Sequence, residues 1–236
     1  MVENRNTEER KEFALADYKG SWNIGAFGIA TDKYVIFGEG FRPQIIRLAK
    51  EVFNNDIIIR NIMDEPIVGI MLAGNSKGLL VPYNIYEKEL EELKSKLDVP
   101  VEKLELKTYE NALGNIILVN DYGAVIHEEI YEKNKESIKM IEDVLDVEVA
   151  AFDFSTVIIG SVACATNKGV LVSPMLLGDE IDFIKEVLRV KVDKGTVNMG
   201  SQYVRTGLIA NSFGFLAGLR TTGIELHKIY ETLIRG

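Results

Sequence analysis

The chain has 236 residues, of which 47% are hydrophobic and 27% charged, and its formal net charge is −9. No apolar run reaches the roughly 18 residues that cross a bilayer, and the N-terminus has no apolar signal region, so we expect no membrane partner. One cysteine allows no intramolecular disulfide and suits a reducing cytoplasm, which is the expected location. The negative charge disfavours a broad RNA-binding surface. It is compatible with a basic protein component of a nucleoprotein partner, and it could also serve only to keep the protein soluble.

The chain begins with a polar, charged extension over residues 1–12, which we predict to be disordered. No Pro/Gly/Ser-rich linker interrupts the remainder, so residues 13–236 are expected to form a single domain.

One hairpin turn recurs along that domain. The turns "NSKG", "NDYG", "TNKG" and "NSFG" end at Gly78, Gly123, Gly169 and Gly214, which are 45, 46 and 45 residues apart, and a worn copy in "ATDKY" ends at Tyr34. The first residue of each turn is expected to bond its own backbone, and the closing glycine to adopt a left-handed conformation. Self-similarity at a fixed period predicts a repeat architecture.

Each copy shows the same order of elements. An apolar run before the turn predicts a strand buried on both faces: "GAFGIA", "VGIMLAG", "GNIILV", "IGSVACA" and "TGLIA". A helical stripe follows, as in Tyr86, Leu90, Leu93 and Leu97 or in Ile138, Ile141 and Leu145. A further strand precedes the next copy: "DIIIRNI", "VEKLELKT", "VEVAAFDF" and "VKVDKGTV".

Three local signals place the starts of helices. Pro43 suits the first residue of a helix, and two pairs have capping-box spacing: Asn84 with Glu87, and Thr222 with Glu225. No single copy has enough core to stand alone. The sequence therefore predicts an α/β fold in which five strand–hairpin–helix repeats close into a five-fold pseudosymmetric propeller with helices outside.

The repeat sorts residues onto two ends of this ring. The turns gather at one end, and the segments before and after each hairpin gather at the other: "IMDEPIV", "YENALGN", "FSTVIIG", "GTVNMGSQY" and "LRTTGIE". The second end is the more irregular, and irregular loops on a rigid scaffold tend to carry binding residues. We expect the working surface there.

Closed rings of this type include enzymes of the guanidine-modifying pentein group, which use a Cys nucleophile with a His and carboxylates. Here Cys164 falls at an interior strand position, His127 at the end of a return strand, and His227 beside the stripe of the last helix. Their register does not bring them together, and no CxxC or HExxH spacing is present, so we predict no catalytic residue, metal or cofactor. A guanidine-modifying hydrolase or transferase using Cys164 is the alternative.

Six motifs in order resemble the translation initiation factor 6 family in its archaeal form. They are "GNSKGLLVP", "ALGNIILVNDYGAVIH", "IGSVACATNKGVLVSP", "GTVNMGS", "LIANSFG" and "TTGIEL". The resemblance implies a pentein fold and a non-enzymatic factor that binds the large ribosomal subunit on its intersubunit face. Such a factor blocks joining of the small subunit and takes part in large-subunit maturation.

The resemblance also implies partners. They are chiefly ribosomal protein L14 (uL14), near the sarcin–ricin loop RNA, with release by a GTPase that works with the Shwachman–Bodian–Diamond protein. A closed ring offers no sheet edge for self-association, so we expect a monomer.

Carried onto this sequence, the ribosome-binding residues of the family fall on Ile70, Asn115, Val162 and Tyr203. Asn115 is the best match, as an amide able to bond a partner's backbone, although it could instead satisfy its own loop. Ile70 and Val162 could serve packing alone. Tyr203 could be an amphipathic anchor or a core residue.

Overall fold

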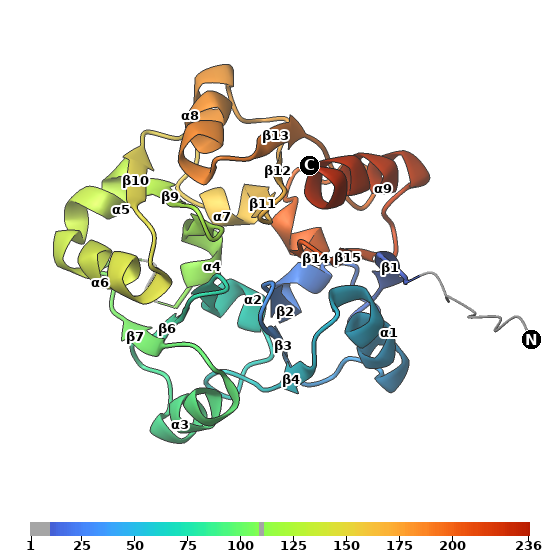
Figure 1. The fold of residues 1–236 in the computed structure, drawn as a ribbon, viewed down its shortest axis with the longest axis horizontal. Coiled ribbons are helices and arrows are strands. Elements are labelled where there is room, and N and C mark those ends of the chain that lie inside the picture. The colour runs from blue at the N-terminus through green and yellow to red at the C-terminus, as the bar shows by residue number, and fades with distance from the viewer. Residues whose placement is uncertain (1–9, 109–110) are drawn as a thin grey trace, which may run out of the picture.

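The computed structural model describes residues 10–108 and 111–236. Five small sheets surround one axis (Figure 1), and in each an antiparallel hairpin is joined by a third strand parallel to its second strand. This arrangement is the predicted pentein ring. The sheets are β2 (Gly28–Ala30), β3 (Val35–Phe37) and β4 (Ile57–Ile59); β5 (Ala73–Gly74), β6 (Leu79–Pro82) and β7 (Val101–Leu104); β8 (Leu118–Val119), β9 (Ala124–His127) and β10 (Val149–Phe152); β11 (Ala163–Ala165), β12 (Gly169–Val172) and β13 (Lys191–Lys194); β14 (Leu208–Asn211), β15 (Gly214–Gly218) and β1 (Phe13–Ala16).

The longer helices lie on the outside of the ring, as predicted (Figure 1). They are α1 (Pro43–Phe53), α3 (Glu87–Lys96), α5 (Glu128–Lys133), α6 (Lys135–Leu145), α8 (Gly178–Leu188) and α9 (Gly223–Tyr230), which continues as η3 (Glu231–Arg235).

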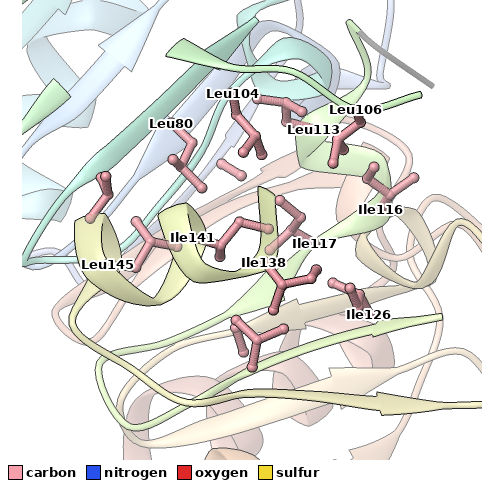
Figure 2. Packing of buried hydrophobic residues seen from close by; sticks show 14 of the residues in the cluster. Leu80, Leu104, Leu106, Leu113, Ile116, Ile117, Ile126, Ile138, Ile141 and Leu145 are labelled. Atoms are coloured by element: carbon pink, nitrogen blue, oxygen red, sulfur yellow. The ribbon is translucent and has the colours of Figure 1, made fainter. Parts of the chain in front are cut away.

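The helices α1, α3, α6, α8 and α9, one in each repeat, bury their apolar stripes against the hairpin of the preceding repeat. Figure 2 shows this for α6, where Ile138, Ile141 and Leu145 pack in one cluster with Leu80 of β6 and Leu104 of β7. The same relation holds in the other four core clusters, for example between Cys164-bearing β11 and α9. Each core cluster thus combines the helix of one repeat with the hairpin of the repeat before it. A single repeat therefore has no core of its own.

The apolar runs before the turns differ from the prediction. Their first halves form single helical turns near the axis, and only the last two to four residues are strands. Periodicity cannot separate a short buried strand from a buried helical turn, and this is why the prediction was wrong. The inner turns are η1 (Ile24–Phe27), α2 (Val68–Met71), α4 (Leu113–Ile116), α7 (Ile159–Val162) and η2 (Arg205–Gly207).

The N-terminal strand closes the ring. β1 pairs in parallel with β15, with Phe13 opposite Phe215, and so supplies the third strand of the last sheet. Just before it, the Arg10 guanidinium donates to the carbonyls of Val52 at 2.9 Å and Phe213 at 3.0 Å. Residues 10–12, which the sequence analysis included in the extension, are therefore joined to the ring. The predicted disorder of the extension otherwise concerns residues 1–9, which lie outside the described residues.

The hairpin turns confirm the role of asparagine but not that of glycine. Asn75 Oδ1 accepts the N–H groups of Lys77 at 3.0 Å and Gly78 at 3.1 Å. The turn glycines do not have positive φ, however. A Cβ on Gly78 would lie 2.1 Å from the Val144 carbonyl oxygen of the next repeat's helix, and a Cβ on Gly169 would lie 1.9 Å from that of Thr232. Glycine is required because a helix end approaches the turn closely.

Two of the three predicted helix starts are found. Pro43 is the first residue of α1, and Thr222 with Glu225 forms a capping box on α9. Asn84 does not cap α3, which begins at Glu87 after the N-cap residue Tyr86. Ile85 is buried in the core and its N–H bonds the Pro82 carbonyl, so this segment forms a turn before the helix can start. Tyr86, predicted to begin the apolar stripe, is therefore exposed.

Candidate functional site

The two ends of the ring differ in how their polar groups are paired. We call the end formed by the five hairpin turns the turn end: residues 31–34, 75–78, 120–123, 166–169 and 211–214. At its centre the second residues of four turns each bond the next: Ser76 N–H to Asp121 at 2.8 Å, Asp121 N–H to Asn167 at 2.9 Å, Asn167 N–H to Ser212 at 3.1 Å, and Ser212 N–H to Asp32 at 2.7 Å. Among the described residues no such bond joins Asp32 to Ser76, whose Oγ is buried without a partner. The four N–H groups and their acceptors are therefore paired inside the molecule.

We call the opposite end, formed by the segments that precede and follow the hairpins, the loop end. Most of the large apolar side chains that are exposed among the described residues lie here, whereas the turn end exposes Tyr122. Tyr109 and Glu110, in the predicted "YENALGN" segment, lie outside the described residues. Aromatic and apolar side chains held in water are a common signature of an interaction surface. They are Tyr83, Tyr86, Met175, Leu177, Met199, Tyr203, Leu219 and Ile224.

Buried glutamates in the first turns of the outer helices hold the loops of the loop end. Glu89 accepts the Met63 N–H at 2.8 Å, and Glu225 accepts the N–H groups of Met199 at 3.2 Å and Gly200 at 2.9 Å. Met63 and Met199 have positive φ, a conformation that costs energy outside glycine and persists only where the surroundings impose it. Sequence spacing pointed to Glu225 as a capping residue and missed its second role, because the loop it holds is about 25 residues away.

The ionisation of Glu225 supports this role. Burial by itself would raise the pKa of the carboxyl, but hydrogen bonds from the Thr222 and Gly200 N–H groups and from the Thr196 and Thr222 hydroxyls hold the pKa below its ordinary value. The carboxylate is therefore charged at neutral pH and accepts all of these donors. The loop that presents Met199 and Tyr203 is fixed by it.

A stacked pair adds to the same surface. The Arg220 guanidinium lies 3.5 Å from the centre of the Trp22 ring, and the Trp22 carbonyl accepts the Asn198 side-chain amide at 3.1 Å. Residues from the first and last repeats are thus joined beside the Met199 loop. An aromatic ring with a guanidinium on its face is a typical anchor at protein interfaces.

Ile70 and Asn115 occupy equivalent positions, one residue after Gly69 and Gly114 in the inner turns α2 and α4. Both side chains are half-buried. Among residues 10–108 and 111–236, the Asn115 side-chain amide has no hydrogen-bond partner. The alternative in which Asn115 satisfies its own loop stays open, because Tyr109 and Glu110 of that loop lie outside the described residues.

Val162 and Tyr203 lie differently. Val162 is 1% exposed and packs in the core with Phe154 and Leu176, so its side chain cannot reach a partner and serves packing. Tyr203 is 54% exposed, just before η2, which excludes the alternative of a core tyrosine. Of the four residues expected to bind, the structure leaves Ile70, Asn115 and Tyr203 accessible at the loop end.

The residues considered for catalysis are engaged elsewhere. Cys164 is buried on β11, and burial raises the pKa of its thiol to about 11. His127 caps α5: its Nδ1 accepts the Glu129 N–H at 3.0 Å, so Nε2 carries the proton and donates to the Phe154 carbonyl at 3.0 Å. His227 is exposed on α9. Within residues 10–108 and 111–236, no group of His, Cys, Asp or Glu side chains could hold a metal ion.

The fold and the loop end define a five-repeat ring protein in which most of the exposed large apolar side chains of the described residues lie at one end. The sequence profile of the eIF-6 family matches residues 13–232, and the chain belongs to that family. Curated relatives called Translation initiation factor 6 come from Pyrococcus abyssi, 36% identical over 92% of this chain and 96% of the relative, and from Methanococcus vannielii, 37% identical over the same shares. Membership of this family gives the chain a role in protein synthesis.

Solved structures with a similar chain path include an arginine dihydrolase from cyanobacteria, called ArgZ. In its apo form it matches 82% of this chain and 30% of its own, at 12% identity and a TM-score of 0.49. Its product-bound N-terminal domain matches 73% of this chain and 67% of its own, at 14% identity and a TM-score of 0.45. Likeness at this level carries nothing about activity. No helix in the described part of the chain is long and apolar enough to span a membrane.

Proposed function

We propose that this protein is a ribosome anti-association and large-subunit maturation factor. It binds the large ribosomal subunit on the face that meets the small subunit, and it prevents joining by occupying that face. The observation that carries the proposal is that most of the exposed large apolar and aromatic side chains of the described residues lie at the loop end, while hydrogen bonds join four of the five turns to the next at the turn end. The translation initiation factor 6 relatives support the same role.

The main contact is a protein of the subunit, L14 (uL14), near the sarcin–ricin loop RNA. A net charge of −9 repels phosphate but attracts a basic ribosomal protein, which speeds encounter and orients docking. The factor acts in the cytoplasm as a monomer, and a GTPase working with the Shwachman–Bodian–Diamond protein releases it.

Three accessible residues make the contact. The Asn115 amide bonds a backbone group of the partner, and Tyr203 buries its ring against the partner while its hydroxyl stays near water. Ile70 adds apolar area beside Asn115. Val162 holds α7 in place from the core.

The mechanism needs no catalysis, because exclusion follows from occupancy. A guanidine-modifying activity would require a reactive thiolate with a base beside it. Burial keeps the Cys164 thiol protonated at neutral pH, and both ring nitrogens of His127 are engaged in holding α5 and the Phe154 carbonyl. No observation favours that second function.

Co-sedimentation with purified archaeal large subunits tests the binding surface. We expect the wild-type protein to pellet with the subunits, and Asn115→Ser and Tyr203→Ala to bind about tenfold or more weakly, the loss of a central interface contact. Tyr122→Ala is the matched control, since Tyr122 is 44% exposed at the turn end. Equal loss in Tyr122→Ala would place the contact elsewhere, and failure of the wild-type protein to bind would refute the proposal.

A further inference from the structure

Arg205 occupies a ring position that glycine holds in the other four repeats. Six residues before the first turn residue lie Gly25, Gly69, Gly114 and Gly160, and in the last repeat Arg205. A Cβ on Gly69 would lie 2.0 Å from the Gly25 carbonyl oxygen, one on Gly114 2.2 Å from that of Gly69, and one on Gly160 2.4 Å from that of Gly114. The inner turns thus touch around the axis, and Arg205 carries the single long side chain of this ring position.

The Arg205 guanidinium is bonded to neutral groups only. Its Nη1 lies 3.0 Å from the Gly25 carbonyl oxygen, 3.2 Å from that of Leu208 and 3.4 Å from that of Gly28, and Nη2 lies 3.4 Å from that of Gly28. Across the described ranges no carboxylate pairs with it, and Nε has no protein acceptor. A guanidinium stays charged at any accessible pH. Because no carboxylate of the described residues pairs with Arg205, its charge has no counter-ion among them.

Nearby ionisable groups do not supply the missing negative charge. Cys164 lines the same cavity, but burial raises the pKa of its thiol to about 11 and keeps it neutral. Asp32 and Asp121 line the axis at the turn end, where both accept the Asn167 amide, at 2.8 and 2.6 Å. Burial also lowers the pKa of the Arg205 guanidinium, as expected for a cation whose charge is not compensated.

The space beside the guanidinium is large enough for a small ion. An axial cavity of about 50 Å³ is lined by Arg205 and by mostly small side chains from all five repeats, among them Ala30, Ala73, Ala165 and Ala210. A water needs about 10–15 Å³ of such volume, so roughly three or four waters, or one halide with fewer waters, fill it.

We propose that this axial cavity binds one small monovalent anion against the Arg205 guanidinium, with chloride as the probe that represents its class. One guanidinium charge and a volume of about 50 Å³ suit one small anion of single charge, since a second negative charge would have no cation to compensate it. The anion accepts the Nε–H and Nη2–H edge that the protein leaves free. It compensates the charge at the centre of the ring.

Bromide substitution tests the site directly in the intact protein. Crystals grown or soaked in sodium bromide should show an anomalous peak on the axis at hydrogen-bond distance from the Arg205 guanidinium. A cavity holding waters only, with bromide confined to the surface as an adventitious ion only, would overturn the proposal.

A solution measurement uses the melting temperature at constant ionic strength, with sodium chloride replacing sodium gluconate. We expect the wild-type protein to gain about 3 °C when chloride exceeds its dissociation constant tenfold. Arg205→Met should lose this gain, while Arg47→Met, which removes an exposed arginine of α1, should keep it. An equal chloride response in both variants contradicts the site. If Arg205→Met does not fold, the bromide result on the wild-type protein decides.

Discussion

The side-chain amide of Asn75 donates to the Leu145 carbonyl at 2.9 Å, although 70 residues separate them. The same amide donates to the Asn120 carbonyl at 3.1 Å. The Asn75 side chain thus bonds the backbone of its own turn and that of the next turn. It also donates a hydrogen bond to a carbonyl at the C-terminal end of the next repeat's helix. Asn120 repeats the arrangement with Leu188 at 2.9 Å, and Asn211 does so with Phe53 at 3.1 Å. Ring closure therefore depends on residues that read locally as turn formers.

Replacing Asn75 with alanine should destabilise the whole ring. The change removes four side-chain hydrogen bonds and leaves buried carbonyls unpaired, for which we expect a loss of about 2–4 kcal/mol. Chemical denaturation measures the change in the free energy of unfolding. Thr31→Ala is the control, since the Thr31 hydroxyl bonds only within its own turn, and it should lose about 1 kcal/mol. Equal losses would show that the links between repeats contribute nothing.

Gly123→Ala tests the close approach of helix and turn. The Cβ of an alanine at position 123 would lie 2.4 Å from the Val187 carbonyl oxygen. That oxygen belongs to the backbone, so it cannot rotate away as a side chain could. We expect a loss of about 2 kcal/mol or more, as for overpacking a core. Gly178→Ala, at the first residue of α8 with no atom within 4 Å, should be neutral or stabilising by about 0.5 kcal/mol. A neutral Gly123→Ala would contradict this explanation of the glycine.

The junction between the first two repeats is closed differently from the others. Tyr34 stands in place of the turn glycine, and its buried hydroxyl donates to the Gly78 carbonyl at 2.9 Å. Ser76 Oγ is buried without a partner there, and a cavity of about 290 Å³ lies beside Tyr34, Leu97 and Val99. We predict that amides of residues 31–34 exchange with solvent faster than those of 120–123.

Tyr34→Phe should open this junction further and cost about 1–2 kcal/mol, because the Gly78 carbonyl loses a donor. Burial raises the pKa of the Tyr34 hydroxyl far above its ordinary value, so the bond persists at alkaline pH. Hydrogen exchange of the turn amides measures the effect. Tyr122→Phe alters a partly exposed hydroxyl and should leave both exchange and stability unchanged. Slower exchange at residues 31–34 than at the other turns would refute the assignment.

Glu225→Gln should loosen the loop that presents Tyr203. The folded pKa of Glu225 lies below its ordinary value of 4.5, so its carboxylate stabilises the fold above that pH, and the stabilisation disappears as pH falls through the folded pKa. We expect a loss of about 1–2 kcal/mol at pH 7 that shrinks towards pH 3, with faster exchange at Met199 and Gly200. Glu186→Gln, on the exposed face of α8, should behave as wild type. A loss that is independent of pH would exclude the carboxylate.

The repeat could be predicted from sequence because turn chemistry is local. The spacing of Gly78, Gly123, Gly169 and Gly214 gave the five-fold ring, and the helical stripes gave the outer helices. The reason for those glycines could not be found, since the contact with Val187 or Thr232 joins residues about 63 positions apart. Local spacing also misplaced the start of α3, because the burial of Ile85 is a tertiary effect.

The candidate site was predicted in part. The repeat register put Asn115 and Tyr203 at the loop end, where the structure leaves both accessible, but Val162 lies in the core. Val162 stands two residues after Gly160, in the register of the buried Met71 and Ile116, whereas Ile70 and Asn115 each stand one residue after their glycine. The sequence analysis did not single out Arg205. Aligning the five repeats shows it, because Arg205 stands where the other four repeats have glycine.

Subunit joining measured by light scattering tests the central claim most directly. Large and small archaeal subunits are mixed with the wild-type protein, with Asn115→Ser combined with Tyr203→Ala, or with Tyr122→Ala. We predict that the wild-type protein and Tyr122→Ala suppress joining at concentrations near that of the large subunit, and that the loop-end double variant does not. Undiminished joining in the presence of the wild-type protein, or equal suppression by all three, would contradict exclusion through the loop end.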